Sequence, residues 1–448
     1  MQNRTETCSA CLRNVEIALI ASPTEVDECM KPMVAMNARG WKPGGAMCIA
    51  CLERWKRLHY ELRSSYPELE ASWSKILPTP LRLDASPRYT GRGVTIAFLD
   101  SGFYAHPDLT KPANRILKYI NLVGSTSPGS LNRPDESSWH GMMTSVVAAG
   151  NGFLSRGLYS SIAPDASVVL VKVGTAARIR HEDIERGLRW VLRNRQRYNI
   201  RIVNISCGGD REASYLSDPL SAAAEAASRA EIVIVAAIGN AGGNPNHPVL
   251  PPASAPSVIS VGGLDDKNTL GIEDDEIYHS SYGPTVDGLQ KPEIIAPAIW
   301  LAAPILPGTP TAEQAALLAE LEREKDSELA GIIRRHPGVD SQLDQAQVLD
   351  SYHLRNLVQL KIRDSNVISG NYKHVDGTSF AAPIVSSIAA QMIEATPALK
   401  PNEVKLALVK SAIPLHGFDR DRQGWGIVNA RGAVEAALAL GDKENTAP

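Results

Sequence analysis

The chain has 448 residues, 46 of them basic and 49 acidic, and its formal net charge at pH 7 is −3. A balance so close to zero argues against a nucleic-acid surface, and no run of eighteen apolar residues, the length of a membrane span, occurs. The length exceeds that of most single hydrophobic cores, which indicates one large domain with additions or two to three domains. The apolar run 15–21 contains Glu16 and lacks the flanks of a secretory signal, so we expect a cytoplasmic protein.

Five of the six cysteines lie in the first 51 residues. Two pairs, each with two residues between its members, are Cys8 with Cys11 and Cys48 with Cys51. Thiolates at this spacing can reach one tetrahedral ion, so we predict a structural zinc site. The two pairs are unusually far apart in sequence, and Cys29 or His59 could replace one ligand. Free buried or redox-active thiols are the alternative interpretation.

Residues 1–80 are predicted to form a separate cysteine-rich module with a helix over 52–66, joined to the rest by the linker Pro78-Thr79-Pro80. We expect this module to recognise a protein partner or to regulate the remainder of the chain. Basic residues beside Trp55 and Tyr60 allow a nucleic-acid surface, but we favour an ordinary amphipathic helix; they are Arg54, Lys56, Arg57 and Arg63.

Downstream of the linker, apolar strand-like runs alternate with helix-like segments. The predicted strands are 94–99, 167–173, 201–206, 231–237 and 257–262, and the predicted helices are 140–150, 181–195, 217–230, 379–396, 401–412 and 429–438. This alternation predicts an α/β fold with a mainly parallel sheet. Active sites in such sheets lie beyond the carboxyl ends of the strands, where Asp100, Ser206 and Asn240 fall.

A hydroxyl nucleophile is indicated by the run Asp376-Gly377-Thr378-Ser379-Phe380-Ala381-Ala382-Pro383, in which Ser379 stands among small residues at a predicted helix start. Serine is a weak nucleophile at neutral pH, so it needs a histidine to take its proton and a buried carboxylate to orient that histidine. Asp100 ends the apolar run 94–99, and His140 opens the predicted helix 140–150. The order along the chain is therefore Asp, His, Ser.

These segments, TIAFLDSG, HGMMTSVVAAG and DGTSFAAP, resemble the three motifs of the subtilisin-like serine peptidases, including their order. The resemblance spans about residues 85–440. It implies a three-layer sandwich with a mainly parallel central sheet over residues 81–441, and a serine endopeptidase that works through an acyl-enzyme intermediate. A non-catalytic protein that binds peptides or partners on the same fold is the alternative.

The resemblance also implies roles for further residues. Asn240 in AAIGN matches the side-chain donor of the oxyanion hole, and the backbone N–H of Ser379 is the other donor. Ser206, Cys207 and Gly208 match the segment that pairs with an extended peptide substrate; Gly239 and Leu250 are expected to line the pocket for the residue before the scissile bond. We expect Cys207 to pack as a small apolar residue.

The resemblance also implies a candidate calcium ligand. Asp108, in the segment HPDL, matches one carboxylate of a calcium site in the family. The loop 151–161 fits the usual ligand spacing poorly. Asp108 as a simple hydrogen-bond acceptor of a turn is the alternative interpretation. The chemistry of the triad itself requires no cofactor.

The chain departs from the family pattern in three places. Met142 and Met143 follow His140-Gly141 where Thr-His is common, and Phe380 replaces the usual Met after the nucleophile. An insertion at about 304–371 is predicted to form one or two helices, the first capped by Thr311 with Gln314, and to serve as a partner surface, a lid or a simple decoration. Residues 442–448 are expected to form a polar, frayed tail.

Overall fold

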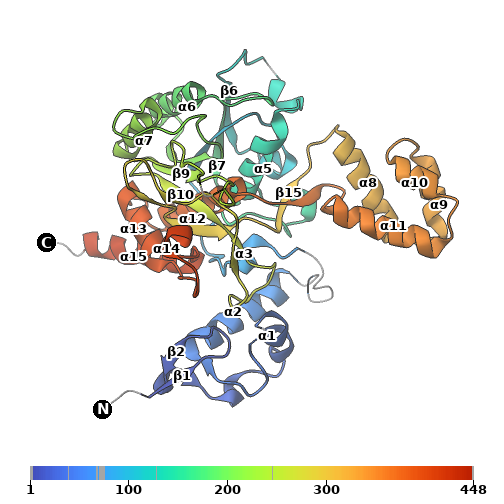
Figure 1. The fold of residues 1–448 in the computed structure, drawn as a ribbon, viewed down its shortest axis with the longest axis horizontal. Helices are drawn as coiled ribbons and strands as arrows, with labels where there is room; N and C mark the ends of the chain where they lie inside the picture. Colours follow the sequence, from blue (N-terminus) through green and yellow to red (C-terminus); the bar gives the residue numbers. More distant parts are fainter. Residues whose placement is uncertain are drawn as a thin grey trace.

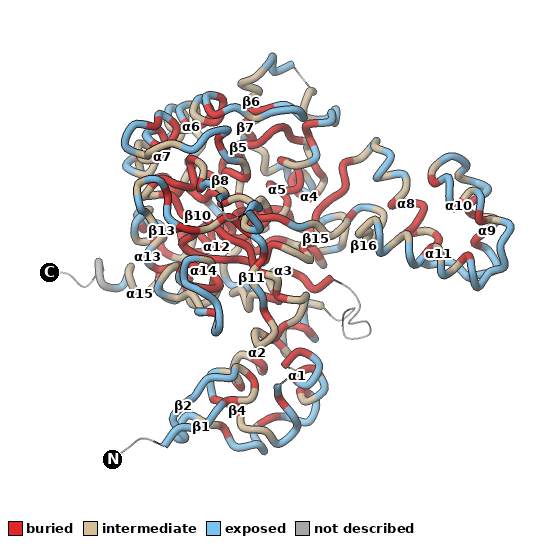
Figure 2. Tube along the Cα trace, viewed as in Figure 1, coloured by how far each residue is buried: buried red, intermediate tan, exposed pale blue. Residues whose placement is uncertain are grey.

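The computed structural model describes residues 4–38, 40–66, 69, 76–127, 129–244 and 246–445. Figure 1 shows three parts: a large body, an N-terminal unit (residues 4–66) below it, and a helical lobe (residues 304–371) that projects to one side. Buried residues concentrate in the body, around its sheet, as Figure 2 shows. No helix in the described part of the chain is both long and apolar enough to cross a membrane.

The body is built on an eight-stranded sheet with the order β11-β10-β9-β8-β5-β7-β6, and β14 pairs with β10. The pairs are parallel except β10 with β11. The strands are β5 (Thr95–Asp100), β6 (Ile116–Asn121), β7 (Ser167–Lys172), β8 (Ile200–Ile205), β9 (Val233–Ala237), β10 (Ile259–Asp265), β11 (Glu276–Ile277) and β14 (Ile294–Pro297). The predicted mainly parallel sheet is confirmed, although β6 and β14 were not predicted.

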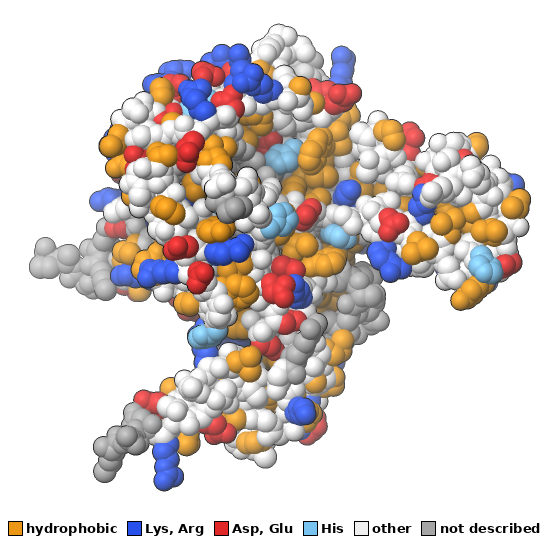
Figure 3. Space-filling view, in the orientation of Figure 1, with side chains coloured by type: hydrophobic (Ala, Val, Ile, Leu, Met, Phe, Trp, Pro, Cys, Tyr) orange, Lys and Arg blue, Asp and Glu red, His pale blue; other side chains and the backbone are white. Residues whose placement is uncertain are grey.

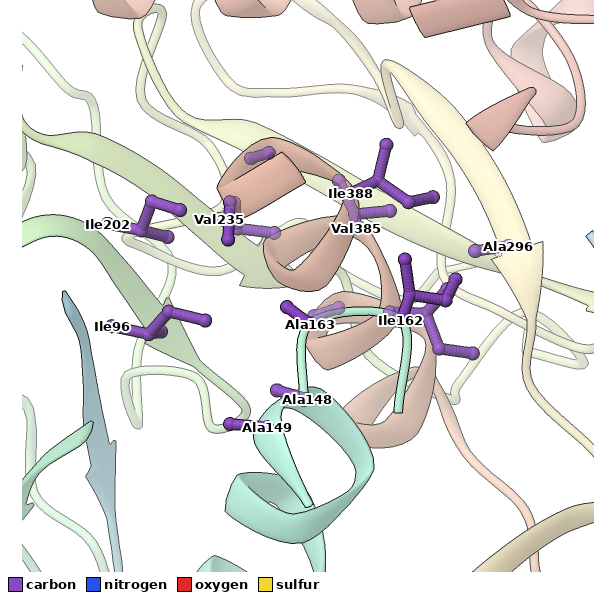
Figure 4. Close-up of a cluster of buried hydrophobic side chains, with 14 of the residues drawn as sticks. Ile96, Ala148, Ala149, Ile162, Ala163, Ile202, Val235, Ala296, Val385 and Ile388 are labelled. Carbon is purple, nitrogen blue, oxygen red and sulfur yellow. The ribbon is translucent and has the colours of Figure 1, made fainter. Parts of the chain in front are cut away.

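Helices cover both faces of the sheet. One face packs against α4 (Pro107–Thr110), α5 (Ser138–Ala149), α12 (Thr378–Ala395), α13 (Pro401–Ser411) and α15 (Ala430–Asn445), and the other against α6 (His181–Asn194) and α7 (Pro219–Arg229). Alternate residues of β5 face the two cores: Ile96 and Phe98 one side, Ala97 and Leu99 the other. Figure 4 shows Ile96, Ile202 and Val235 meeting Val385 and Ile388 of α12. This three-layer arrangement confirms the predicted fold class.

The helix α12 lies at the centre of the body and carries the predicted nucleophile in its first turn. Its buried residues include Ala381, Ala382 and Ala389, and it contacts β8, β9, β10 and β14. Small side chains allow the helix to approach the sheet closely, so its N-terminus is held at the carboxyl edge of the strands.

The N-terminal unit has its own apolar core, in which Trp41, Trp55 and Leu58 are buried. Its elements are β1 (Thr5–Thr7), β2 (Asn14–Glu16), β3 (Ile20–Ala21), α1 (Lys31–Asn37), β4 (Met47–Cys48) and α2 (Ile49–Ser65). The predicted helix over 52–66 is therefore present as α2. With Trp55 buried in the core, α2 has the character of an ordinary amphipathic helix that packs against its own unit.

A polar seam joins the N-terminal unit to the body. Asn37 Oδ1 accepts the N–H of Leu270 at 3.1 Å, and Arg57 of α2 pairs with Asp84 at 2.6 Å. Leu270 itself belongs to the apolar core of the N-terminal unit. Since Arg57 is engaged with a carboxylate of the same chain, the structure favours the amphipathic-helix interpretation over a nucleic-acid surface.

The predicted linker 78–80 is not an open connection, because a short helix, α3 (Thr79–Arg82), begins inside it. Arg82 is buried and donates to both carboxylate oxygens of Asp266, at 2.7 Å from Nε and 2.5 Å from Nη2. A buried, bidentate Arg–Asp pair fixes this segment to the body. Residues 70–75, which precede the predicted linker, lie outside the described residues.

The helical lobe contains more helices than predicted. Instead of one or two, the described residues form four: α8 (Pro310–Arg323), α9 (Leu329–Arg335), α10 (Ser341–Ala346) and α11 (Ser351–Asp364). They share a small apolar core that includes Leu318, Leu321 and Leu354. The predicted cap at Thr311 was also wrong: Thr309 caps α8 by accepting the N–H of Ala312, and Thr311 lies inside the helix.

A three-stranded sheet joins this lobe to the body, with β15 (Leu301–Pro304), β16 (Val367–Ser369) and β17 (Tyr372–Val375) in the order β15-β17-β16. The remaining elements are β12 (Gly283–Pro284), β13 (Gln290–Lys291) and α14 (Arg420–Gln423). The expected frayed tail is corrected as well, because α15 continues as far as Asn445; residues 446–448 lie outside the described residues.

Candidate active site

Asp100 and His140 meet at the carboxyl end of β5. His140 Nδ1 lies 2.8 Å from Asp100 Oδ1 and 3.0 Å from Oδ2. Asp100 is 1% exposed and also accepts the backbone N–H of Ser101 at 2.7 Å and the hydroxyl of Thr144 at 3.2 Å. A buried carboxylate held by so many donors keeps the imidazole in one orientation, with Nδ1 as donor and Nε2 facing away from Asp100.

Gly141 allows α5 to pack closely enough against β5 to bring His140 and Asp100 together. A Cβ placed on Gly141, the residue after His140, would lie 2.1 Å from the carbonyl oxygen of Gly102 and 2.9 Å from Asp100 Cβ. No other residue fits between α5 and the end of β5, so Gly141 sets the distance between His140 and Asp100. Thr144 was not predicted as a residue of the site. It lies about one turn beyond Gly141 on α5, and its hydroxyl donates to the same carboxylate of Asp100.

Burial and the neighbouring carboxylate act in opposite directions on the imidazole. Burial alone lowers the pKa of His140, but the charge and the hydrogen bond of Asp100 outweigh it and leave the pKa raised above 6.5. His140 also lies beside two aromatic rings, with centroids 5.2 Å away for Trp139 and 5.9 Å for Phe380. The imidazolium form is therefore stabilised, as a base that accepts a proton requires.

Ser379 stands in the first turn of α12. Its hydroxyl donates to the carbonyl oxygen of Ser206 at 3.0 Å, and the hydroxyl of Ser206 donates back to the carbonyl oxygen of Ser379 at 2.8 Å. Gly377, which precedes the helix, has φ +130°, a conformation that other residues rarely adopt. The hydroxyl of Ser379 thus points at the residue that follows β8, and no hydrogen bond between Ser379 and His140 is recorded among the described residues. Looser contacts of this kind are common before substrate binds.

Asn240 lies across from Ser379, beyond the end of β9. Its Oδ1 accepts both the N–H and the hydroxyl of Thr378, each at 2.9 Å. These two bonds identify the oxygen and leave Nδ2 as the remaining donor. No acceptor for Nδ2 is found among the described residues, and Asn240 lines the same cavity as Ser379 and His140. The amide nitrogen is therefore free to bind an oxygen that develops beside Ser379.

The segment predicted to pair with substrate follows β8. Gly208 lies against Leu250, whose side chain would be 3.6 Å from a Cβ at this position, and Gly239 donates its N–H to Thr378 Oγ1 at 3.2 Å. Cys207 packs against the apolar core on the α6 and α7 side, and burial raises the pKa of its thiol. The thiol is thus a packing group and a poor nucleophile.

A cavity of about 580 Å³ opens beside the triad. Three of the predicted site residues, His140, Asn240 and Ser379, line it. A lid was one of the roles considered for the insertion, but the lining residues of the helical lobe and of β17 were not predicted. The residues that line the cavity are Glu136, Trp139, His140, Met143, Asn240, Ile305, Leu306, Thr309, Thr311, Asn366, Lys373, His374, Val375, Asp376, Ser379 and Phe380.

The four cysteines predicted to bind metal form one cluster, and they are distant in sequence from the residues that line this cavity. The Sγ atoms of Cys8, Cys11, Cys48 and Cys51 all lie within 4.8 Å of one another. Tetrahedral zinc with Zn–S bonds of 2.3 Å needs sulfurs about 3.8 Å apart, so the cluster fits such an ion. Cys8 Sγ also accepts the N–H of Cys48 at 3.2 Å.

The proposed substitute ligands do not take part in this cluster. Cys29 is exposed, and neither it nor His59 belongs to the group of four. Hydrogen bonds among the thiols lower the pKa of Cys8 and raise that of Cys51, because one thiolate is held by the protons of its neighbours.

Asp108, the predicted calcium ligand, accepts a hydrogen bond on each of its carboxylate oxygens. Its Oδ1 accepts the N–H of Leu154 at 3.0 Å, and its Oδ2 accepts the hydroxyl of Tyr372 at 2.6 Å. Both oxygens are thus occupied by protein donors, and no metal-ligating group that includes Asp108 is found in the described residues. The structure favours the alternative interpretation, in which Asp108 accepts hydrogen bonds that tie β17 to the loop after α5.

Comparisons with known proteins agree with this geometry. The fold resembles that of fervidolysin from Fervidobacterium pennivorans, a keratinolytic enzyme related to subtilisin, with a TM-score of 0.52 and 19% sequence identity over 80% of this chain and 45% of that one. The chain is 32% identical over 361 residues to serine protease AprX of Bacillus subtilis (strain 168), covering 77% of this chain and 67% of that protein.

Subtilisin NAT of Bacillus subtilis subsp. natto is 28% identical over 227 residues, which is 49% of this chain and 51% of that protein. The model of the subtilase family of peptidases matches residues 91–428, the range that contains Asp100, His140, Asn240 and Ser379. The chain therefore belongs to the subtilase family of serine peptidases.

Proposed function

We propose that this subtilase is an endopeptidase in which Ser379 attacks the peptide carbonyl, His140 acts as general base and then general acid, and Asp100 orients the imidazole. The observation that carries the proposal is the bond of 2.8 Å between His140 Nδ1 and the buried Asp100, in the cavity that also contains Ser379. This bond leaves Nε2 to take the proton of the hydroxyl.

Each step follows from the positions of these groups. As the Ser379 oxygen bonds to the carbonyl carbon, its proton passes to His140 Nε2 and the carbonyl oxygen becomes an oxyanion. The free Nδ2 of Asn240 and the backbone N–H of Ser379 donate to that oxygen. His140 then protonates the leaving amine and the peptide bond breaks, which leaves an acyl-enzyme that water hydrolyses by the same route in reverse.

The substrate is an extended peptide. Gly208 follows the end of β8, and no partner for its backbone N–H and C=O is recorded in the described residues. A peptide strand can add to these groups with its cleaved bond beside Ser379, because the Ser379 hydroxyl already touches Ser206.

The cysteine cluster is proposed to hold structural zinc. Cys8, Cys11, Cys48 and Cys51 would bind the ion as thiolates, and its four bonds would add to the stabilisation that the apolar core of this unit provides. Reduced thiols persist in a reducing compartment, which accords with the expected cytoplasmic location.

A fluorophosphonate probe tests the enzymatic proposal. It should label the wild-type protein at Ser379, and Ser379→Ala and His140→Ala should abolish both labelling and peptide cleavage. Ser65→Ala, at an exposed position of α2, is the matched control and should label fully. A folded wild-type protein that binds peptide but refuses the probe would instead support the alternative of a non-catalytic binding protein.

A further inference from the structure

The cavity beside the triad lies on the side of Ser379 from which the leaving amine departs. Its lining includes His140 and Phe380 but none of Ser206, Cys207 and Gly208, the segment proposed to hold the acyl part of the substrate. The imidazole must reach the leaving nitrogen to protonate it. The residue that follows the scissile bond is therefore directed into this cavity.

The floor of the cavity is apolar. Met143, Leu306 and Phe380 are each at most 5% exposed, and Val375 of β17 and Trp139 add further apolar surface. Met143 and Phe380 are two of the positions at which the chain departs from the common motifs, and both line the same cavity. Figure 3 shows apolar and histidine side chains gathered where the helical lobe meets the body.

The helical lobe closes the far end of the cavity. Thr309 and Thr311 of the first turn of α8 line it, together with Asn366 between α11 and β16. The base of this lobe is fixed to the body, because β17 pairs with β15 and Tyr372 of β17 donates its hydroxyl to Asp108 at 2.6 Å. The insertion thus converts one half of an open cleft into a bounded pocket.

Charge at the cavity favours a neutral side chain. Glu136 and Asp376 contribute two carboxylates and Lys373 one ammonium group, and no ion pair involving Lys373 is found in the described part of the chain. Burial first, and then the charge of Lys373, lowers the pKa of His374 despite the opposing effect of Asp376, so His374 is uncharged at neutral pH. Burying a charged side chain of either sign against the apolar floor would cost desolvation free energy, whereas an uncharged apolar side chain gains contact there.

We propose that the helical lobe of this protein builds a specificity pocket for the leaving half of the substrate, and that it selects a large apolar residue immediately after the scissile bond. The inference rests on the proposed endopeptidase function. A volume of about 580 Å³ accommodates side chains of the size of Leu, Phe or Trp. Selectivity for the residue after the scissile bond thus depends on the insertion, which lies outside the three catalytic motifs.

Two kinds of substrate test the proposal, both with one fixed acyl half that the wild type cleaves. In peptides, the residue after the scissile bond is varied among Phe, Leu, Gly, Asp and Lys; in a coumarin amide, the leaving group contains no amino acid. For the wild type we expect kcat/KM to be about tenfold or more higher with Phe or Leu than with Gly, Asp or Lys.

Filling the pocket should remove this preference. Thr311 is exposed in the first turn of α8, so Thr311→Trp adds an indole to the cavity with little effect on the core of the lobe. The ratio of kcat/KM for Phe over Gly should fall towards one, while the variant still reacts with the fluorophosphonate at Ser379, which shows that the triad is assembled. Thr311→Leu is a smaller filling variant should the indole prevent folding.

The matched control is Gln342→Trp, an exposed position of α10 that does not line the cavity, and it should retain the wild-type ratio. A wild-type ratio near one, or a ratio that both Thr311 variants leave unchanged, would overturn the pocket while leaving the endopeptidase proposal intact. A wild type that neither hydrolyses the coumarin amide nor reacts with the fluorophosphonate would overturn both.

Discussion

The body and the N-terminal unit are stabilised in different ways. The body buries two large apolar cores against opposite faces of its sheet, and the groups of the active site are tied to those cores by α5 and α12. The N-terminal unit has short strands, one small core and four clustered thiols. The contrast indicates that catalysis and metal binding can be disturbed separately. The seam between the two parts, which includes Asn37, Arg57 and Asp84, is tested last.

The largest effect is expected from Asn240. Asn240→Ala should lower kcat by about 10²–10³-fold, the magnitude known for loss of this donor in subtilisin itself, while the metal content of the N-terminal unit stays unchanged. Steady-state kinetics and elemental analysis measure the two quantities.

Two matched variants separate donation from positioning at this residue. Asn240→Asp keeps acceptors for Thr378 but has no amide donor, so it should be as inactive as Asn240→Ala. Thr378→Val removes the hydroxyl bond of 2.9 Å to Asn240 and the bond of 3.2 Å from the N–H of Gly239, but it keeps the amide donor of Asn240 and should cost far less. An active Asn240→Asp variant would show that the side chain only positions Thr378.

Removing a thiol should affect the N-terminal unit and spare the cleft. Cys48→Ser should abolish a zinc content of about one ion per chain and unfold α2, because metal binding supplies much of the folding free energy of so small a unit. Labelling of Ser379 by the fluorophosphonate should persist.

Cys29→Ser is the control, since Cys29 is exposed and outside the cluster. It should keep the metal. Freshly prepared, reduced wild-type protein without metal would contradict the zinc proposal, and loss of Ser379 labelling in Cys48→Ser would contradict the independence of the two regions.

The pH dependence of cleavage should report the pair of His140 and Asp100. The base must be neutral to accept a proton, and its pKa is raised above 6.5, so kcat/KM should fall about tenfold per pH unit below a midpoint that lies above 6.5. Kinetics from pH 5 to 9, with fluorescence at each pH to verify folding, measure this midpoint. A midpoint at or below 6.5 in the folded protein would refute the assigned cause of the shift.

The smallest effect is expected at the seam. Asp275 lines a cavity at this seam together with Arg54 and Arg57 of α2. Burial first, and then the charges of Asp266 and Asp274, raises the pKa of Asp275 from 3.8 to about 8. The folded protein thus holds a proton that the unfolded chain releases, and this stabilisation is complete below pH 3.8 and is lost as the pH rises through 8. Asp275→Asn should match wild type near pH 4 and have a Tm about 1–3 °C higher near pH 8.

Asp27→Asn, an exposed substitution in the N-terminal unit, should shift Tm equally little at both values. Thermal unfolding at the two pH values, with hydrogen exchange of α2, provides the measurement. An Asp275→Asn variant that is no more stable at pH 8 than at pH 4, relative to wild type, would show that Asp275 is ionised in the folded protein.

Much of the body could be predicted because its signals are local. Apolar runs predicted β5, β7, β8, β9 and β10. Asp100 and Asn240, which follow two of these runs, were predicted as polar groups at strand ends. The strand β6 was missed because five of its six residues are only partly buried and the sixth is exposed, so it lacks a continuous apolar run. The tail, residues 442–448, was predicted to be frayed because of its polar composition, but the helix α15 continues into it as far as Asn445.

The sequence by itself determined the identities and order of Asp100, His140, Asn240 and Ser379, because each stands in a short motif that resembles one of the subtilisin-like peptidases. It also determined the two thiol pairs. Only the tertiary structure decided that the four thiols meet, that Asp108 accepts from Leu154 and Tyr372, and that the helical lobe bounds the cavity beside Ser379. These contacts join residues up to hundreds of positions apart, and packing in three dimensions, which no local pattern encodes, decides which of them form.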